Sequence, residues 1–434
     1  MRICWFTNVP FPNACRAAGR SAYPSGGWLS SLGEALLATG NVELLVVSFV
    51  LGGSEASVRA GGCDHELIAI EPKRFLREWC YYPSTAVRRK CSQIVARFRP
   101  DVVHINGTEG SYGLLLAEGD IRAPAVVSIQ GVLRAVAGYY CGGISFRDRW
   151  RSFSIRDLIR RDGLVQQQRE LARRAQRVER RILQLDALFV GRTQFDEAYL
   201  RAVNPYATYY HSDEVLRPPF YTAERDPNQV VPYAIFTSTA PYPLKGFHCL
   251  LKAVGLLKQR FPQIAVRVLG SPARNSWRAT GYQKYLHGLI GSLGLEDHVV
   301  PLGELDADGV ARELARAHVF AFPSFADNSP NSLGEAMLVG VPVVVSFAGG
   351  MPSMVRDRET ALCFPLGDET VMAECIRTVF THDHLAQRLA QKARQVALAR
   401  HDPQRIARKM LEIYAAARRR QTTGGGRAGA RTLT

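Results

Sequence analysis

The stretch VFAFPSFADNSPNSLGEAMLVGVPVVVS, residues 319–346, contains the pattern that decides the fold. Residues 319–323 and 342–346 are short apolar runs rich in Val and Phe, as in strands that are buried on both faces. Residues 332–338, between them, carry a helical pattern. Because a strand, a helix and a second strand follow one another closely, the stretch predicts a parallel sheet covered by helices.

Strand and helix patterns alternate in the same way throughout the chain. In the first half the expected strands are residues 2–7, 42–49, 67–70, 101–105 and 125–129, with a helix at 28–38. In the second half further strands are expected at 233–237, 265–269 and 298–302, with helices at 247–261, 282–293 and 310–317. Residues 217–232 are rich in proline, which is typical of a linker, and 434 residues exceed what one core usually organises. Two α/β domains are therefore expected.

Composition narrows the function only in part. The formal net charge of +16 fits proteins that bind nucleic acid, anionic membrane surfaces or phosphorylated substrates. Nine scattered cysteines without a C-x-x-C pair indicate reduced thiols in a cytosol. No apolar segment is long enough to span a membrane, so we expect a cytoplasmic protein that meets a membrane, if at all, peripherally at its inner face.

Residues 147–181 form a long polar helix pattern with a strongly basic balance. This segment has twelve arginines against five acidic residues and an apolar stripe that includes Leu158, Leu164 and Leu171. Cationic amphipathic helices bind anionic leaflets, which predicts a membrane contact here. A solvated helix face explains the same pattern equally well.

Lys245 lies in the segment 241–246, between an expected strand and an expected helix. A lysine on a glycine-bearing turn at a helix start combines a positive charge with free backbone N–H groups, which suits a diphosphate. Read alone, it is also compatible with an ordinary exposed lysine.

The residues from Asp327 to Glu335 form the second candidate site. Asn331, Ser332 and Leu333 start a predicted helix, where backbone N–H groups receive phosphate oxygens. Glu335, one turn further, would accept both hydroxyls of a ribose, and Asp327 would reach hydroxyls of a sugar. A capped helix with a carboxylate in its first turn is the alternative.

Several motifs together resemble the family 4 retaining glycosyltransferases of GT-B fold, in which two Rossmann-like domains face each other across a cleft. They are the acidic-x7-Glu motif from Asp327 to Glu335, followed by Ala-Met, then Gly-x-Pro-Val-Val at 340–344 and Gly-Gly-x-Pro at 349–352. Lys245-Gly246 matches the family's diphosphate lysine, and Gly26-Gly27 matches its N-terminal glycine loop. The resemblance extends from about residue 2 to about residue 414.

The resemblance implies an organisation and a reaction. Residues 1–220 would be the acceptor-side domain, residues 221–400 the donor domain, and residues 401–420 a helix that packs back, while the polar residues 421–434 are expected to be disordered. The donor would be a UDP- or GDP-sugar, transferred with retention and without an essential metal. Asp327, Glu335 and Lys245 would form the catalytic and donor-binding set, and Asp306 and Asp308 are assigned a capping role instead of a metal site.

The chain departs from the family pattern at three positions. Asp327 stands where the family usually has Glu, and Ala240 where it often has an arginine, for which Arg192 is a candidate substitute. Gln130 replaces a frequent histidine and cannot titrate.

The acceptor side is predicted from the end of the strand at 101–105. Asn106 and Glu109 follow His104 there, and with Gln130 and Arg192 they are the acceptor-side candidates. The expected activity is sugar transfer to a glycan or a lipid-linked acceptor in surface-polysaccharide synthesis. A nucleotide-sugar epimerase of the same fold is the alternative enzyme, and a nucleic-acid-binding protein is disfavoured because no binding module is recognisable.

Overall fold

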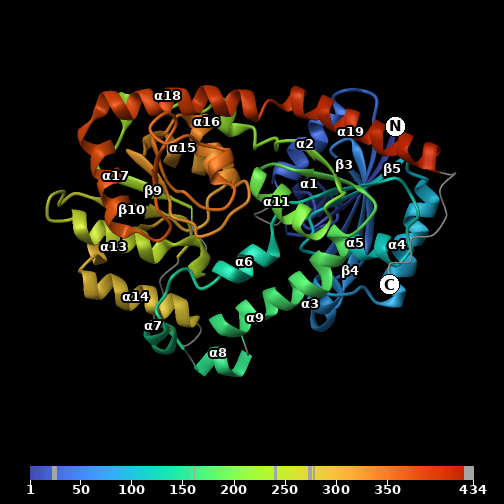
Figure 1. Ribbon diagram of the computed structural model, residues 1–434, viewed down its shortest axis with the longest axis horizontal. Coiled ribbons are helices and arrows are strands. Elements are labelled where there is room, and N and C mark those ends of the chain that lie inside the picture. Colours follow the sequence, from blue (N-terminus) through green and yellow to red (C-terminus); the bar gives the residue numbers. More distant parts are fainter. Residues whose placement is uncertain are drawn as a thin grey trace.

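The computed structural model describes residues 1–21, 27–153, 155–160, 162–238, 242–271, 276 and 279–424. It contains two parallel-type sheets that lie side by side, each flanked by helices (Figure 1). Gly26 and Ala240, both singled out in the sequence, lie outside the described residues.

The N-terminal sheet has eight strands in the order β3-β4-β2-β1-β5-β6-β7-β8. Only the edge strand β3 is antiparallel, to β4. The strands are β1 Arg2–Thr7, β2 Glu43–Leu51, β3 Ala56–Ala60, β4 Cys63–Ile70, β5 Val102–Asn106, β6 Ala125–Ser128, β7 Leu188–Gly191 and β8 Thr208–His211. The helices are α1 Pro12–Ala17, α2 Gly27–Leu37, α3 Pro72–Cys80, α4 Thr85–Phe98, α5 Tyr112–Ala117, α6 Leu133–Tyr139, α7 Phe146–Arg151, α8 Ile155–Arg160, α9 Leu164–Arg174, α10 Arg180–Leu183 and α11 Gln194–Val203.

The C-terminal sheet has six parallel strands in the order β11-β10-β9-β12-β13-β14. They are β9 Ala234–Thr237, β10 Ala265–Val268, β11 Val299–Pro301, β12 Val319–Phe322, β13 Val343–Ser346 and β14 Leu362–Phe364. The helices are α12 Pro219–Thr222, α13 Phe247–Leu257, α14 Gly281–Leu293, α15 Ala307–Arg316, α16 Asn331–Val339, α17 Glu369–Thr381, α18 Asp383–Arg400 and α19 Pro403–Gly424. Short 3-10 turns lie at Pro227–Gln229, Pro243–Lys245, Glu296–His298 and Met351–Ser353.

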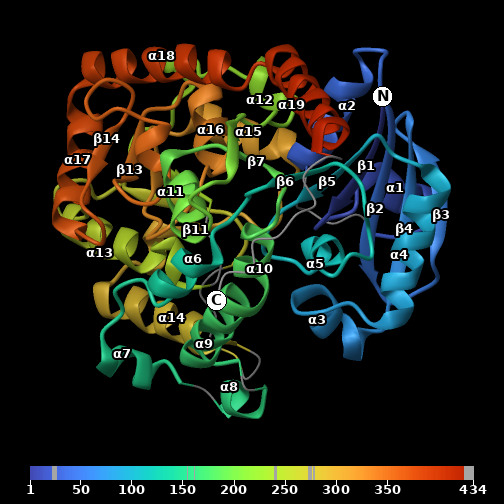
Figure 2. The ribbon, with the colours of Figure 1, turned by 45° about the vertical axis from the view of Figure 1, so that its right-hand side comes forward.

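The last helix returns to the N-terminal sheet, as predicted. After α18 has crossed the top of the C-terminal sheet, α19 lies beside α2 (Figure 2). Tyr414 of α19 is fully buried there, and its hydroxyl accepts a hydrogen bond from Trp5 Nε1 at 3.1 Å. The same hydroxyl lies 2.8 Å from His104 Nδ1, whose other ring nitrogen contacts Ser128. Burial lowers the pKa of His104 to about 3, so this histidine is a neutral core residue.

The single long helix predicted for residues 147–181 is wrong. The segment folds as the short helices α7, α8 and α9, the π-helical turn Ala175–Glu179 and then α10. The reason is tertiary, because α7 and α8 leave the N-terminal domain and pack on α14. Asp157 Oδ2 accepts the N–H of Gly281 at 2.9 Å, and a Cβ at Gly281 would lie 1.5 Å from the Ser152 carbonyl oxygen.

Other boundaries also differ from expectation. The strands β3, β7, β8 and β14 and the helices α1, α3, α4, α5, α6, α11, α12, α17 and α18 were not predicted. Helix α19 extends to Gly424, so residues 421–424 are helical instead of disordered, and residues 425–434 lie outside the described residues. The proposed domain limits stay a prediction.

Candidate functional site

Each sheet has a topological switch point, where the strand order reverses and a crevice opens at the carboxyl ends of two strands. In the C-terminal sheet it lies between β9 and β12, and in the N-terminal sheet between β1 and β5. Lys245 follows β9 and Asp327 follows β12, while Asn106 is the last residue of β5 and Glu109 follows it. The fold therefore places the predicted residues of each half at the edge where ligands bind in such sheets.

Lys245 and Asp327 form an ion pair at the C-terminal switch point. Lys245 Nζ lies 2.5 Å from Asp327 Oδ2, which also accepts the Ser324 hydroxyl at 2.9 Å. Burial alone would lower the pKa of Lys245, but the charge of Asp327 raises it, so the ammonium stays charged. Gly246 sets this turn, with a φ of 69°, and a Cβ there would lie 1.9 Å from the Pro323 carbonyl oxygen.

Helix α16 begins at Asn331, as predicted, but its amides are not equivalent. The N–H of Leu333 already donates to the Pro330 carbonyl at 3.1 Å, which closes the first turn. No such bond is recorded for the N–H groups of Asn331 and Ser332 within the described residues, so these two amides are the ones left for an anion.

Glu335 does not stand free in the first turn of α16. Its two oxygens accept hydrogen bonds from Nε and Nη2 of Arg217, both at 2.8 Å, in a bidentate pair. Burial raises the pKa of Glu335 and Arg217 opposes that rise. Arg217 also lies beside Gly27, where an added Cβ would come within 2.8 Å of its Cδ. Glu335, Arg217 and Gly27 are thus brought together where the two domains meet.

Arg217 is the residue that sequence reasoning missed. It lies in the linker, 118 positions from Glu335, and its guanidinium packs 4.8 Å from the centre of the Phe220 ring. The only local signal was an arginine directly before two prolines in a segment that leads into the C-terminal domain.

Asn328, next to Asp327, connects the two domains and was also missed. Its Nδ2 donates to Asp196 Oδ2 at 2.8 Å and to the Gln130 carbonyl at 3.2 Å, while its Oδ1 accepts from the Thr193 hydroxyl at 2.5 Å. The loop that carries Asp327 is therefore held directly against the N-terminal domain, and Gln130 lies at this junction.

Arg192 lies at the same junction, but its partner is Glu214 and not a residue of the lysine turn. The two side chains form a buried ion pair, and Asn331 at the start of α16 also acts to lower the pKa of Glu214. Burial outweighs the attraction of Arg192 and raises the pKa of Glu214 to about 7.

We expect Glu214 to make stability fall as pH rises from 4.5 to about 7. In that interval the folded chain keeps a proton on Glu214 that the unfolded chain has released, so deprotonation favours unfolding. Glu214→Gln should make the fall in unfolding free energy less steep by up to about 1.4 kcal/mol per pH unit. Urea unfolding at pH 5, 6 and 7 measures this, with Glu224→Gln, whose side chain is exposed, as the control. A slope equal to that of the wild type would contradict the prediction.

A polar cluster lies at the N-terminal switch point. Asn8 after β1, Asn106 and Glu109 after β5, and Trp79 of α3 each have a buried polar atom without a hydrogen-bond partner in the described structure. Arg174 of α9 donates to the Glu109 carbonyl at 2.6 Å and leaves its own Nε unpaired. Burial raises the pKa of Glu109. Because buried polar groups are rarely left unpaired, these atoms suit a polyhydroxylated ligand.

A cavity of about 650 Å³ lies between the two domains beside Lys245 and Asp327. Its walls come from α3, α6 and α9 on the N-terminal side and from the loops of Lys245 and Asp327 on the other. Gln130 and Arg174 line it from one side, and Lys245 and Asp327 from the other.

Two structural findings concern metals and membranes. In the described part of the chain, no three His, Cys, Asp or Glu side chains are grouped so that they would hold a metal ion. Asp306 caps α15 by accepting the N–H of Gly309 at 2.8 Å, as predicted. None of the described helices is long and apolar enough to cross a membrane. That no metal is essential stays a prediction.

Comparison with known proteins finds a family match in the C-terminal half of the chain. Residues 226–396 match the family model described as Glycosyl transferases group 1. Over this segment the chain is similar to the group 1 glycosyltransferases. The segment contains Lys245, Asp327 and Glu335, so the motifs that suggested family 4 glycosyltransferases lie within the matched segment.

Curated relatives match the same part. A phosphatidyl-myo-inositol mannosyltransferase of Mycobacterium leprae is 26% identical over 181 residues, which are 42% of this chain and 45% of the relative. A D-inositol 3-phosphate glycosyltransferase of Salinispora arenicola is 30% identical over 178 residues, 40% of this chain and 38% of the relative. The chain thus spans less than half the length of these relatives.

Solved structures match nearly the whole chain. A sucrose-phosphate synthase from Thermosynechococcus elongatus has a TM-score of 0.72 at 18% identity and covers 96% of this chain and 98% of its own. HepE of Anabaena, in complex with UDP and glucose, has a TM-score of 0.65 at 18% identity and covers 96% of this chain and 100% of its own. At such identities the likeness shows the fold, and the predicted GT-B fold is confirmed.

Proposed function

We propose that the protein is a retaining glycosyltransferase that moves a sugar from a nucleotide-sugar to a hydroxyl of a glycan or lipid-linked acceptor in surface-polysaccharide synthesis. The observation that supports it most is the placement of two ion pairs, Lys245–Asp327 and Arg217–Glu335. Both pairs lie where the segment that matches the group 1 family meets the N-terminal domain. In this proposal both pairs open to bind the donor.

Each partner has a role in the bound state. The ribose hydroxyls donate hydrogen bonds to the oxygens of Glu335 in place of Arg217. Arg217 is then free to turn toward the diphosphate. Lys245 and the amides of Asn331 and Ser332 hold the diphosphate, and Gly27 allows the chain to approach it. Asp327 contacts the transferred sugar. Arg217 then supplies the second positive charge, which the family 4 glycosyltransferases often have from an arginine at the position of Ala240.

The reaction requires little acid–base catalysis by protein side chains. The acceptor attacks on the face of the leaving group, and the departing diphosphate takes the acceptor proton. The protein positions the reactants and stabilises negative charge on the diphosphate as it leaves. The epimerase alternative is disfavoured. An epimerase needs a titratable acid–base group, and Gln130 at the junction cannot titrate.

A thermal-shift screen against UDP-, GDP- and ADP-sugars tests donor binding. UDP-glucose is the first donor to try, because HepE, a neighbour of the same fold, was crystallised with UDP and glucose. A shift with one nucleotide-sugar supports the proposal, and the absence of a shift with all three would refute it.

We expect Glu109→Gln to impair transfer and to leave donor binding intact. Glu109 lies at the acceptor side of the cleft, and loss of a charged hydrogen bond to an acceptor hydroxyl costs about 1.5–3 kcal/mol, or roughly tenfold to a hundredfold in kcat/KM. Transfer from UDP-glucose to an octyl glucoside measures it. Glu118→Gln, a change at an exposed acid of the same domain, is the control. Unchanged transfer by the Glu109→Gln variant would remove Glu109 from the acceptor site.

A further inference from the structure

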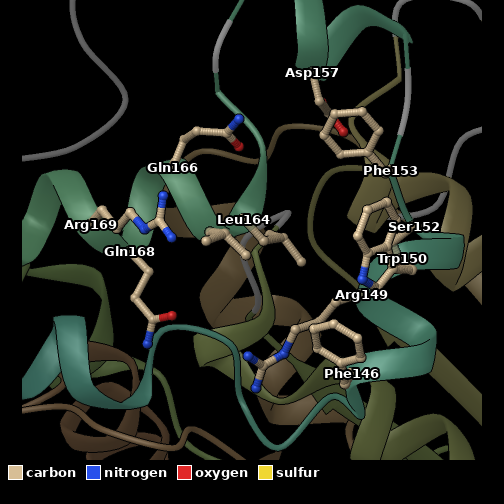
Figure 3. A pocket seen from close by; sticks show the side chains of 11 residues that line it. Phe146, Arg149, Trp150, Ser152, Phe153, Asp157, Leu164, Gln166, Gln168 and Arg169 are labelled. Atoms are coloured by element: carbon tan, nitrogen blue, oxygen red, sulfur yellow. The ribbon is translucent and has the colours of Figure 1, made fainter.

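A second cavity, of about 660 Å³, lies outside the cleft, between α7, α8 and α9. Figure 3 shows Phe146, Trp150 and Phe153 on one side of it and Gln166, Gln168 and Arg169 on the other, with Leu164 between them. This cavity has no role in the function proposed above.

Its rim is apolar and exposed. Phe146 is 75% exposed, Trp150 68% and Phe153 46%, and Ile159 on the neighbouring helix α8 is 76% exposed. Large apolar side chains gathered in this way on a surface mark a binding site for an apolar partner. Aromatic rings are also effective contacts, because they bury a large area with few rotatable bonds.

The cavity is firmly attached to the body of the protein. Ile144, directly before α7, is buried in the core of the C-terminal domain. Arg149 Nε donates to the Ile144 carbonyl at 3.0 Å, and Asp157 Oδ2 accepts from Gly281. On the other side, Gln168 Nε2 of α9 donates to the Ala137 carbonyl of α6 at 2.8 Å. Figure 1 shows α6 to α9 lying below the two sheets, with α7 beside α14.

Helix α9 lies between this cavity and the cleft. Val165 and Arg169 line the outer cavity, whereas Leu171 and Arg174 line the cleft cavity. At 1.5 Å per residue, Val165 and Arg174 are about 14 Å apart along the helix. Arg174 donates to the backbone carbonyl of Glu109. The two sets of residues lie on opposite faces of α9, so this helix forms the wall between the two cavities.

The charge around the outer cavity selects an anionic molecule. Arg149 and Arg169 line it, against one acidic residue, Asp157. Arginine binds phosphate well. An apolar cavity lined by two arginines is complementary to a hydrocarbon chain that is joined to a phosphate.

We propose that the cavity between α7, α8 and α9 binds the hydrocarbon chain of a lipid phosphate, with the phosphate at Arg149 and Arg169. That this lipid serves as the acceptor rests on the proposed function. The site itself is tested by binding alone, without donor or turnover.

The experiment titrates the full chain with geranylgeranyl monophosphate, below its critical micelle concentration, by calorimetry. Geranylgeraniol and inorganic phosphate are the comparison ligands. We expect the monophosphate to bind, the alcohol to bind more weakly and phosphate alone not to bind. The double variant Trp150→Ser/Phe153→Ser should weaken binding at least about tenfold, because it removes two apolar contacts. Val165→Asp, on α9, should do the same.

Tyr206→Ser is the matched control, because Tyr206 is an aromatic residue that is 95% exposed and does not line either cavity. Equal affinity of the wild type and the double variant would overturn the proposal. A second pair of results would also overturn it: the monomeric lipid does not bind the wild type, and the double variant no longer floats with phosphatidylglycerol vesicles. The aromatic rings would then contact a membrane surface and not a single lipid. A donor-induced thermal shift, measured in parallel, separates this outcome from failure of the glycosyltransferase proposal.

Discussion

Replacing Lys245 by Ala is expected to lower kcat about 10²- to 10³-fold, the usual effect of losing one preorganised group that stabilises charge in the transition state. The charge that builds up on the leaving diphosphate would lose its nearest ammonium. The fold should survive, because Asp327 still accepts the Ser324 hydroxyl. Release of UDP from UDP-glucose in a coupled assay measures the effect.

Lys252→Ala is the control for this change. Lys252 lies in α13, close behind the lysine turn, and its ammonium is 3.7 Å from Glu369 in a partly exposed pair. The variant removes an equal charge from the same domain without touching the cleft. If Lys245→Ala and Lys252→Ala had the same kcat, Lys245 would not be the diphosphate residue.

Replacing Glu335 by Ala is expected to abolish nucleotide-induced stabilisation and to destabilise the free protein. The loss of stability should be about 2–3 kcal/mol, somewhat below the cost for a fully buried pair, because the Arg217 side chain keeps 28% exposure. Urea unfolding with and without UDP measures both effects.

Two further variants separate stability from binding. Arg217→Met/Glu335→Leu replaces the ion pair by apolar contacts and should recover most of the stability, but not the UDP shift. Glu313→Ala breaks the bidentate Arg267–Glu313 pair in the same domain and should lose stability while it keeps the UDP shift. A UDP shift that persists in Glu335→Ala would show that the ribose is bound elsewhere.

The sequence predicted those parts of the site that depend on local chain order. Lys245 and Asp327 follow adjacent strands of one sheet, so their strand assignments were enough to place them together. Glu335 could be placed one turn inside α16 from the start of its helix. The parallel sheets were likewise predictable from the alternating strand and helix patterns, whereas the return of helix α19 was implied by the resemblance to the family 4 glycosyltransferases.

The parts that were missed depend on contacts between distant segments. Arg217 meets Glu335 across 118 positions, and no local pattern in a proline-rich linker indicates that partner. The helix expected at 147–181 has a continuous helical pattern, but the contacts with α14 and Gly281 divide it. Strands β7 and β8 were also missed, although β6 and β9, which are equally short, were predicted.

The paths of α7, α8 and α19 determine how this enzyme scaffold can be divided. Ile144 is part of the core of the C-terminal half, while Tyr414 completes the core of the N-terminal half. Part of the core of each half is therefore supplied by a segment from the other half of the sequence. A chimera made by cutting once, in the proline-rich linker, would expose both of these core surfaces. An exchange of donor specificity between relatives is better made by grafting the loops of Lys245 and Asp327 than by exchanging whole halves.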